Sequence, residues 1–336
     1  MSTRTATPAE VFFQYISGFW VSQCLYVAAR LGIADHLKDG AKSADQLAAL
    51  TNSHSRTLYR VLRALASVGI FQEENGTFSL TPVGELLKSG PSGLRAMAIH
   101  LCEPNSWKPW GDLLYAVQTG QLPFKHVHGE DIFAFYAAHP ESFEPFNEAM
   151  TNYSMYAAEA VTAAYDFSGI GTLVDVGAGH GTLLQAILRA NPALKGVAFD
   201  LPAVIDGVRP IASEPGMAGR FEIAGGDFFV SVPSGDAHIM KTIIHDWDDA
   251  RSAEILRSIH RAQKPGGKLI LVEIVITEGP GSTMGKLSDL NMLVLPGGQE
   301  RTVEEYRRLF ERCGFRLTRV MPTESMLSII EGVRSE

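Results

Sequence analysis

The first long apolar segment of the chain, residues 11–29 (VFFQYISGFWVSQCLYVAA), contains no charged side chain. A helix that is apolar on every side is typical of a large core, a subunit interface or a bilayer. The segment is almost long enough to cross a membrane, but Gln14, Gln23 and several serine and glycine residues interrupt it. Polar residues are costly inside a bilayer, so we predict a buried or dimer-forming helix and no membrane association.

Residues 43–87 combine two helical patterns with a hairpin pattern. Ser43 is a favourable N-cap for the first helix, and apolar residues recur at helical spacing over residues 56–68. The segment GIFQEENGTFSL then contains Asn75 and Gly76, a pair that two-residue hairpin turns prefer. Helix, turn, helix and hairpin in this order predict a winged-helix fold.

Residues 91–165 have a helical pattern and are rich in large side chains. Most such side chains fill a core, but aromatic rings and methionine also bind flat apolar ligands well. The large residues of this segment are Trp107, Trp110, Phe124, Phe133, Phe135, Tyr136, Phe143, Phe146, Met150, Tyr153 and Tyr156. A few of them are candidates for an aromatic pocket.

From about Gly171 the pattern changes to short apolar runs separated by helical stretches. The runs are TLVDVGAG, GVAFDLP, RFEIAGGDFF, AHIMKTII and GKLILVEIVI. Apolar strands alternating with helices predict an open α/β sheet with parallel strands and both faces covered, a Rossmann-like plan. We therefore predict a winged-helix domain at residues 1–100, a helical linker at 101–165 and a Rossmann-like domain at 166–336.

Composition and charge narrow the class of protein. The chain has 336 residues, of which 46% are hydrophobic, so it is long enough for two domains with sizeable cores. Its formal net charge of -8 and the lack of long single-sign runs disfavour a nucleic-acid partner. Arg56, Arg60 and Arg63 nevertheless share one face of the second winged-helix helix, where a DNA reader holds its contacts. A DNA-binding regulator is therefore an alternative, although a disfavoured one.

The cysteines and the start of the chain indicate the cellular compartment. Cys24, Cys102 and Cys313 are far apart and form no CxxC pair, which argues against a disulfide framework or a structural zinc site. The segment MSTRTATPAE lacks the basic and then apolar layout of a signal peptide. We expect a cytoplasmic protein.

A glycine-rich turn, within LVDVGAGHGTLLQAIL, follows the first strand of the predicted sheet. Gly177, Gly179 and Gly181 let the backbone approach a ligand where an open sheet binds its small molecules. This pattern alone is also typical of dinucleotide-binding folds. Three acidic residues near strand ends distinguish a dinucleotide site from a site for another nucleoside: Asp175, Asp200 and Asp227. They favour a nucleoside that carries a cation over one that carries a diphosphate, because Asp175 would repel the phosphates.

At this point the sequence resembles a known family. The ordered motifs DVGAGHG, FDLP, GDFF, KTIIHDWDD, LVEIVI and GGQERT, together with FNEAM and the winged-helix segment, cover nearly the whole chain. They are similar to class I S-adenosylmethionine (SAM)-dependent O-methyltransferases, the family of plant caffeic acid O-methyltransferase and of bacterial enzymes that methylate phenazines, anthracyclines and other aromatic natural products. The resemblance implies a dimerisation role for the winged-helix domain and a homodimer.

The resemblance also implies a SAM site, from which S-adenosylhomocysteine (SAH) would leave as product. Asp200 is placed to accept hydrogen bonds from ribose hydroxyls, and Asp227 with Phe228 to contact the adenine. Ser154 would reach the cofactor from the helical linker. The predicted cofactor residues are Ser154, Asp175, Gly177, Gly179, Asp200, Leu201, Gly226, Asp227, Phe228 and Lys241.

The segment IIHDWDD, residues 243–249, holds the candidate catalytic base. His245 follows the fourth predicted strand and therefore faces the cleft, and a neutral imidazole can take a proton from a phenol or enol as it is methylated. A metal site with Asp246 and the two later aspartates is an alternative. Adjacent residues at a helix start point in different directions, however, and aspartates there cap amides, so we predict no metal.

Two glutamates are predicted to flank this histidine. Glu273 lies within an apolar strand, where an acidic residue is unusual, and Glu300 follows a Gly-Gly turn that would bend it into the cleft. In the family, glutamates at these two motifs flank the base, so we assign His245, Glu273 and Glu300 to catalysis. The resemblance gives as acceptor-binding candidates Phe146, Asn147, Met150, Asp246 and Asn291.

The predicted reaction is methyl transfer from SAM to a hydroxyl of a small aromatic acceptor, in an α/β protein with a helical N-terminal domain. Some proteins with this fold bind SAM yet carry out hydroxylation, decarboxylation or a pericyclic step, and this is the main alternative. The sequence does not identify the acceptor.

Overall fold

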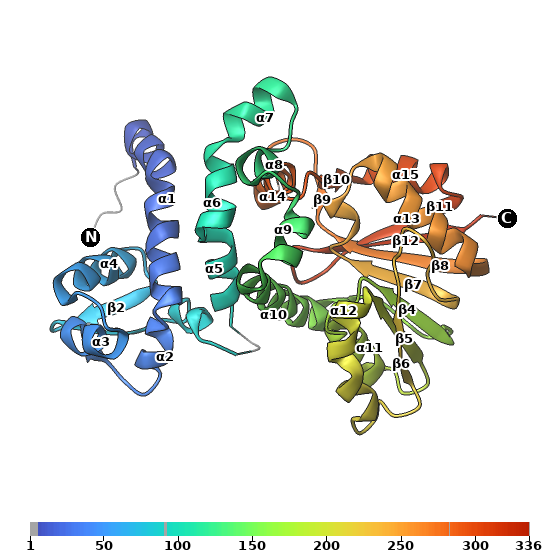
Figure 1. Cartoon of the computed structure of the whole chain (residues 1–336), viewed down its shortest axis with the longest axis horizontal. Helices are drawn as coiled ribbons and strands as arrows, with labels where there is room; N and C mark the ends of the chain where they lie inside the picture. Colours follow the sequence, from blue (N-terminus) through green and yellow to red (C-terminus); the bar gives the residue numbers. More distant parts are fainter. Residues whose placement is uncertain (1–5, 91–92, 282, 336) are drawn as a thin grey trace. The chain divides into compact units, whose positions relative to one another are not determined.

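The computed structural model describes residues 6–90, 93–281 and 283–335, in two compact units (Figure 1). The first unit contains the described chain up to Trp107 together with Pro140–Tyr153. The second contains Lys108–His139 and the described chain from Ser154 onward. The domain boundaries expected at residues 100 and 165 stay predictions.

The first unit has the predicted helices and hairpin. Ser43 caps α3 (Ala44–Thr51), α4 (Ser55–Ser67) follows, and Asn75 and Gly76 turn the hairpin with positive φ angles of 49° and 77°. Its sheet has the order β1 (Lys42–Ser43), β3 (Thr77–Leu80), β2 (Phe71–Glu74). Its other elements are α1 (Pro8–Arg30), α2 (Ile33–Leu37), η1 (Gly84–Leu87), α5 (Arg95–Cys102), the first half of α6 (Pro104–Gly111) and the first part of α10 (Pro140–Ala164).

Helix α1 buries little of its apolar surface. Thr7 and Glu10 form a capping box at its start, and only Ala28 and Ala29, at its end, are buried. Its exposed aromatic side chains include Phe13, at 65% exposure, and Trp20, at 64%. Over the residues that the structure describes, no helix is both long and apolar enough to cross a membrane.

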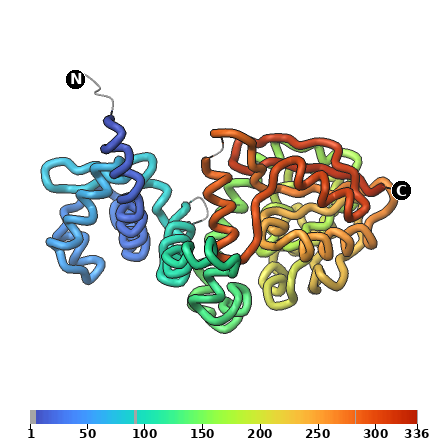
Figure 2. Tube along the Cα trace, turned by 90° about the horizontal axis from the view of Figure 1, so that it is seen from above, coloured from blue at the N-terminus to red at the C-terminus, as the bar shows by residue number. Residues whose placement is uncertain are grey.

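The second unit is built on a sheet of seven strands. Their order is β11 (Phe315–Pro322), β12 (Ser328–Arg334), β8 (Gln263–Glu273), β7 (Gly235–Lys241), β4 (Thr172–Val176), β5 (Lys195–Asp200) and β6 (Phe221–Gly225) (Figure 1). The five strands from β8 to β6 pair in parallel, and β12 pairs antiparallel with β8 and β11. Figure 2 shows the red C-terminal strands beside the orange segment that contains β8. The predicted α/β sheet is confirmed.

Helices cover both faces of this sheet. Buried side chains of α13 (Asp249–Ala262) and α15 (Val303–Arg312) pack on one face, against side chains that include Val197 of β5. Side chains alternate along a strand, so the neighbouring Gly196 faces the other side, where it lies against Leu184 of α11 (Thr182–Ala190). The remaining elements of the unit are α7 (Leu113–Thr119), α8 (Pro123–His128), α9 (Ile132–Ala138), α12 (Pro202–Ile205), η2 (Asp206–Ser213), η3 (Ile244–Asp246), β9 (Val275–Ile276), α14 (Thr283–Val294) and β10 (Arg301–Thr302).

The topology brings most of the predicted site residues of this unit to one edge. Strands β4, β5, β7 and β8 are parallel neighbours, so their carboxyl ends lie side by side. Open α/β sheets bind their ligands at this edge. Beyond it, β9 and β10 form a separate parallel pair in which Val275 lies opposite Arg301. This pair brings the chain after Glu273 next to the chain after Glu300.

Candidate active site

The glycine-rich turn after β4 has the conformation that its sequence predicts. Its three glycines all have positive φ angles: 77° at Gly177, 54° at Gly179 and 69° at Gly181. Residues other than glycine rarely adopt such angles. The amide of Gly179 donates a hydrogen bond of 2.8 Å to Oδ2 of Asp200. The turn is therefore fixed to the end of β5, and its backbone is open to a close approach by a ligand at Gly179, where an added Cβ would meet no described atom within 4 Å.

Two opposite charges are buried beside this turn. Asp175 is 2% exposed, and its Oδ2 has no hydrogen-bond partner among the described residues. Burial raises the pKa of Asp175 to about 7 and lowers the pKa of Lys241 to about 8. The Lys241 ammonium donates to Oγ1 of Thr242. An unpartnered buried carboxylate oxygen next to the glycine turn is a position at which a ligand would supply the missing donor.

Further polar groups lie at the ends of β5 and β6. The Asp200 carboxylate also accepts from the amide of Leu201, and the amide of Gly226 donates to the Asp200 carbonyl at 3.0 Å. Asp227 uses one oxygen to accept from the amide of Phe229, so its second oxygen is available to a ligand. The Phe228 ring packs edge-on against Phe229. Ser154 lies on α10, and its predicted cofactor contact stays a prediction.

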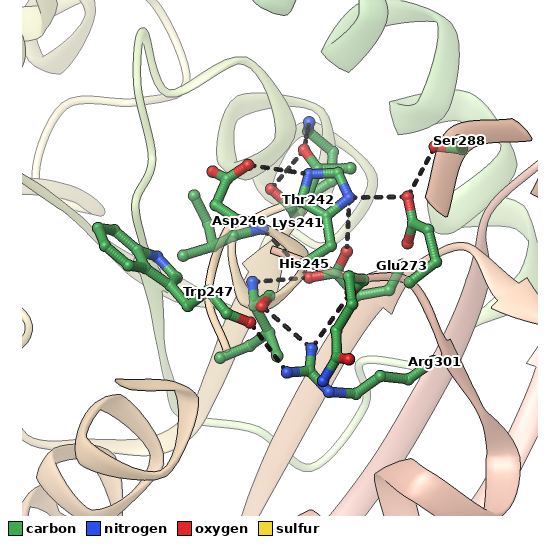
Figure 3. A network of polar contacts seen from close by, with 12 residues as sticks. Lys241, Thr242, His245, Asp246, Trp247, Glu273, Ser288 and Arg301 are labelled. Atoms are coloured by element: carbon green, nitrogen blue, oxygen red, sulfur yellow. Dashed lines mark hydrogen bonds and ion pairs between the residues drawn. The ribbon is translucent and has the colours of Figure 1, made fainter. Parts of the chain in front are cut away.

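His245 lies between carboxylates at the end of β7 (Figure 3). Its Nδ1 is 3.0 Å from Oε1 of Glu300 and 3.6 Å from Oε2 of Glu273, and its Nε2 is 3.5 Å from Oδ1 of Asp246. Only 12% of the His245 side chain is exposed. The structure therefore brings together the three residues that we assigned to catalysis.

The two glutamates are themselves held in place. Oε1 of Glu273 accepts hydrogen bonds from the amides of Ile243 and Ile244, at 3.1 and 2.9 Å. Oε1 of Glu300 accepts from the hydroxyl of Ser288 at 2.8 Å as well as facing His245. Both glutamate side chains are buried, so neither can move away from the imidazole without losing these contacts.

The carboxylates decide the charge of the imidazole. Burial by itself lowers the pKa of His245, but the charges of Glu273 and Asp246 and the hydrogen bond to Glu300 raise it to about 10. Burial also raises the pKa of Glu273 to about 7 and that of Asp246 to about 6. In the protein by itself these carboxylates therefore favour the protonated imidazole. A cation bound nearby would lower its pKa, because like charges disfavour the protonated form.

The same cluster has ligand atoms suited to a metal ion. One atom each of His245, Glu273 and Glu300 lie within 4.8 Å of one another. The two later aspartates have other partners: Asp248 caps α13 by accepting from the amide of Arg251, and Asp249 pairs with Arg301. The helix-cap role of Asp248 is confirmed, whereas the absence of a metal stays a prediction.

The residues expected to bind the acceptor belong to both units. Asp246 and Asn291 are in the second unit, where Oδ1 of Asn291 accepts from the indole nitrogen of Trp110 at 3.0 Å. The others are in the first unit, on α10: Phe146, Asn147 and Met150. The contacts of all five with an acceptor stay predictions.

Several residues around the site were given no specific role from the sequence. Ser288 and Trp110 orient site side chains, and Gly298 and Arg301 contact the chain that carries His245. The Ser288 hydroxyl had no sequence signal, because its partner Glu300 comes from another segment, and Trp110 was noted only as one of the large side chains of residues 91–165. Arg301 and Gly298 lie in the motif GGQERT, where only Glu300 was interpreted.

Comparison with known proteins gives the family. Residues 110–316 match the model of the O-methyltransferase domain, and residues 13–90 match the O-methyltransferase dimerisation domain. Over 326 residues the chain is 47% identical to phenazine O-methyltransferase PhzM of Lysobacter antibioticus, covering 96% of this chain and 95% of the relative.

Solved structures agree with this match. The crystal structure of LaPhzM superimposes with a TM-score of 0.93 at 46% identity, covering 98% of this chain and all of the other. The SAH-bound CalO1, a methyltransferase in calicheamicin biosynthesis, has a TM-score of 0.87 at 34% identity, covering 97% and 98% of the two chains. The chain belongs to the SAM-dependent O-methyltransferase family, as its motifs predicted, and is an enzyme of that family.

Proposed function

We propose that the enzyme methylates a hydroxyl of a small aromatic acceptor and that His245 is the general base. The observation that carries this proposal is the placement of the imidazole between Glu273, Glu300 and Asp246, with Nδ1 on the glutamate side. In this proposal Glu300 accepts a hydrogen bond from Nδ1–H and thereby selects the neutral tautomer whose Nε2 can take up a proton. Glu273 stabilises the imidazolium that results.

Three observations support the proposal that the predicted cofactor residues bind SAM. The glycine turn is open to a ligand at Gly179, the buried Asp175 oxygen lacks a donor among the described residues, and the Asp227 carboxylate retains an oxygen for an adenine amine. When bound, SAM supplies an electrophilic methyl group on a cationic sulfonium. The carboxylates of Asp175 and of the histidine cluster favour a cation near the turn. We propose that SAM is held by the cofactor residues predicted from the sequence.

The protonation state of His245 links cofactor binding to proton transfer in this proposal. The base must be neutral to accept the hydroxyl proton, yet in the protein by itself its pKa is raised to about 10. A positive charge bound close to the cluster would oppose protonation. We propose that cofactor binding converts His245 to the neutral form, so that the base becomes active only when a methyl donor is present.

The first acceptor to test is a hydroxylated phenazine, because the relative at 47% identity is named for that class. Incubation with SAM should yield methylated acceptor and SAH in equal amounts, and no methylated acceptor without enzyme. Consumption of an acceptor without SAH would instead indicate non-methyl-transfer chemistry. Activity that EDTA abolishes and Mg²⁺ restores would contradict the metal-free mechanism.

A further inference from the structure

Residues 242–247, here called the histidine turn, carry His245 into the site through an unusual backbone conformation. Thr242 has a φ of 51°, which is rare for a β-branched residue. Such conformations persist only where the surrounding structure holds them. The imidazole can therefore keep its place only if other groups fix the backbone of this turn.

Two buried side chains of opposite charge hold that backbone. Glu273 accepts from the amides at the start of the turn, as described above. Arg301, which is completely buried, donates from Nη1 to the carbonyl of Ile244 at 3.2 Å and from Nη2 to the carbonyl of Trp247 at 2.9 Å. These two carbonyls flank His245 and Asp246 in the sequence. Figure 3 shows the guanidinium beside the turn, away from the imidazole.

The guanidinium is in turn anchored to helix α13. Nε and Nη2 both donate to Oδ1 of Asp249, at 3.0 and 2.9 Å, and Nη2 also contacts the hydroxyl of Ser252 at 3.2 Å. A buried charge is tolerated only when its donors are satisfied, and the planar fork of arginine meets several acceptors at once. Lysine has one nitrogen and could not reproduce this set of contacts.

Arg301 follows Glu300 directly in the sequence, and this connects it to the site. The side chains of these consecutive residues contact different parts of the same turn: Glu300 contacts the His245 ring, and Arg301 contacts the carbonyls of Ile244 and Trp247. We propose that Arg301 is a positioning residue, which holds the histidine turn so that the His245 ring stays between Glu273 and Glu300. This inference rests on the proposed role of His245 in proton transfer.

The test compares Arg301→Lys with a matched control, Arg312→Lys. Arg312 also approaches Asp249, at 3.9 Å, but its side chain is 55% exposed. We expect Arg301→Lys to lower kcat by roughly 10- to 100-fold, the size of effect that a displacement of about 1 Å produces. The KM for acceptor and the Kd for SAM, measured by calorimetry, should stay at the wild-type values. Arg312→Lys should change none of these quantities.

A second readout separates positioning from general stability. The ring nitrogens of His245 are observed by ¹H–¹⁵N NMR, with the signals assigned by their loss in His245→Gln. Arg301→Lys should shift the Nδ1 signal, because the contact with Glu300 changes. Unchanged kcat, unchanged ring shifts, or parallel loss of turnover and SAM binding would each overturn the inference.

Two further variants cover the cases in which Arg301→Lys does not fold or His245 is not the base. If Arg301→Lys does not fold, Asp249→Ala removes the anchor while leaving Arg301 in place, and it should lower kcat and shift the Nδ1 signal to a smaller extent. Wild-type values for both in Asp249→Ala would then overturn the inference. If His245→Gln itself retains turnover, the proposed function fails, but the ring shifts still report whether Arg301 positions the imidazole.

Discussion

At the scale of single residues, the chemistry depends on the charge state of one imidazole. Both ring nitrogens of His245 face carboxylates, so the protein by itself favours imidazolium, whereas a general base must be neutral. The proposed sulfonium of the cofactor supplies the opposing charge.

Removal of the imidazole tests the proposed general base. His245→Ala should lower kcat by about 10²- to 10⁴-fold, the usual contribution of a general base, and should retain SAM binding. Turnover is measured by SAH release and binding by calorimetry. The matched control is His260→Ala, because this histidine lies on α13 outside the cluster and should be replaceable without loss of turnover. Wild-type turnover in His245→Ala would exclude the base.

The pKa of His245 tests the proposed link between cofactor binding and protonation. The pKa of His245, followed by NMR, should be raised in the protein alone and should fall when SAM binds, because two nearby positive charges disfavour each other. SAH, which lacks the sulfonium charge, should lower it much less. Turnover should be lost as the pH falls through the pKa that His245 has in the SAM-bound enzyme, because the base is then protonated. Equal effects of SAM and SAH would contradict the electrostatic coupling.

At the scale of elements, the short parallel pair of β9 and β10 decides the geometry of the site. It brings the end of β8, with Glu273, beside the chain that follows α14, with Glu300. Before β10 the chain runs directly along the histidine turn, where the amide of Gln299 donates to the His245 carbonyl at 2.8 Å. The loop before β10 is therefore as much part of the site as the strand ends are.

This close approach gives a prediction for Gly298. A Cβ atom at this position would lie 1.9 Å from the His245 carbonyl oxygen, so Gly298→Ala must displace the histidine turn. We expect kcat to fall by about 100-fold or more, in line with the cost of a misplaced catalytic group. The control is Gly207→Ala, since a Cβ there meets no atom within 4 Å. Full activity of Gly298→Ala in a steady-state assay would show that the turn tolerates the shift.

At the scale of the whole molecule, the first unit matches a dimerisation domain and leaves the aromatic face of α1 exposed. Exposed apolar surface of this kind is typical of an interface between proteins. We therefore propose that a second copy of the chain covers the exposed face of α1, which includes Phe13 and Trp20, and that the enzyme is a homodimer.

The double variant Phe13→Asp/Trp20→Asp should shift the molecular mass from dimer to monomer, because it places two charges in the interface. Light scattering coupled to size exclusion measures the mass. A control variant, Leu114→Asp, charges an exposed apolar residue of α7 and should leave the mass unchanged. A monomeric wild-type chain, or a dimeric double variant, would contradict the proposed interface.

Local patterns predicted much of this fold. The hairpin at Asn75 and Gly76, the helix cap at Asp248 and the glycine turn after β4 each depend on a few consecutive residues, so they could be recognised directly. The parallel sheet followed from apolar strands alternating with helices. Neither the antiparallel pairing of β12 with β8 nor the pair of β9 with β10 was predicted, because both depend on residues far apart in the chain.

The motifs were sufficient to identify the family, the strand ends at which a cofactor site is expected, and His245, Glu273 and Glu300 as one group. The three-dimensional arrangement was needed to see that three carboxylates surround the His245 ring, and that Arg301 contacts the carbonyls of Ile244 and Trp247 on either side of the histidine. The physical reason is that motifs record residue types at short spacing. Charge state and backbone restraint depend instead on distances of a few ångströms between side chains that different elements bring together.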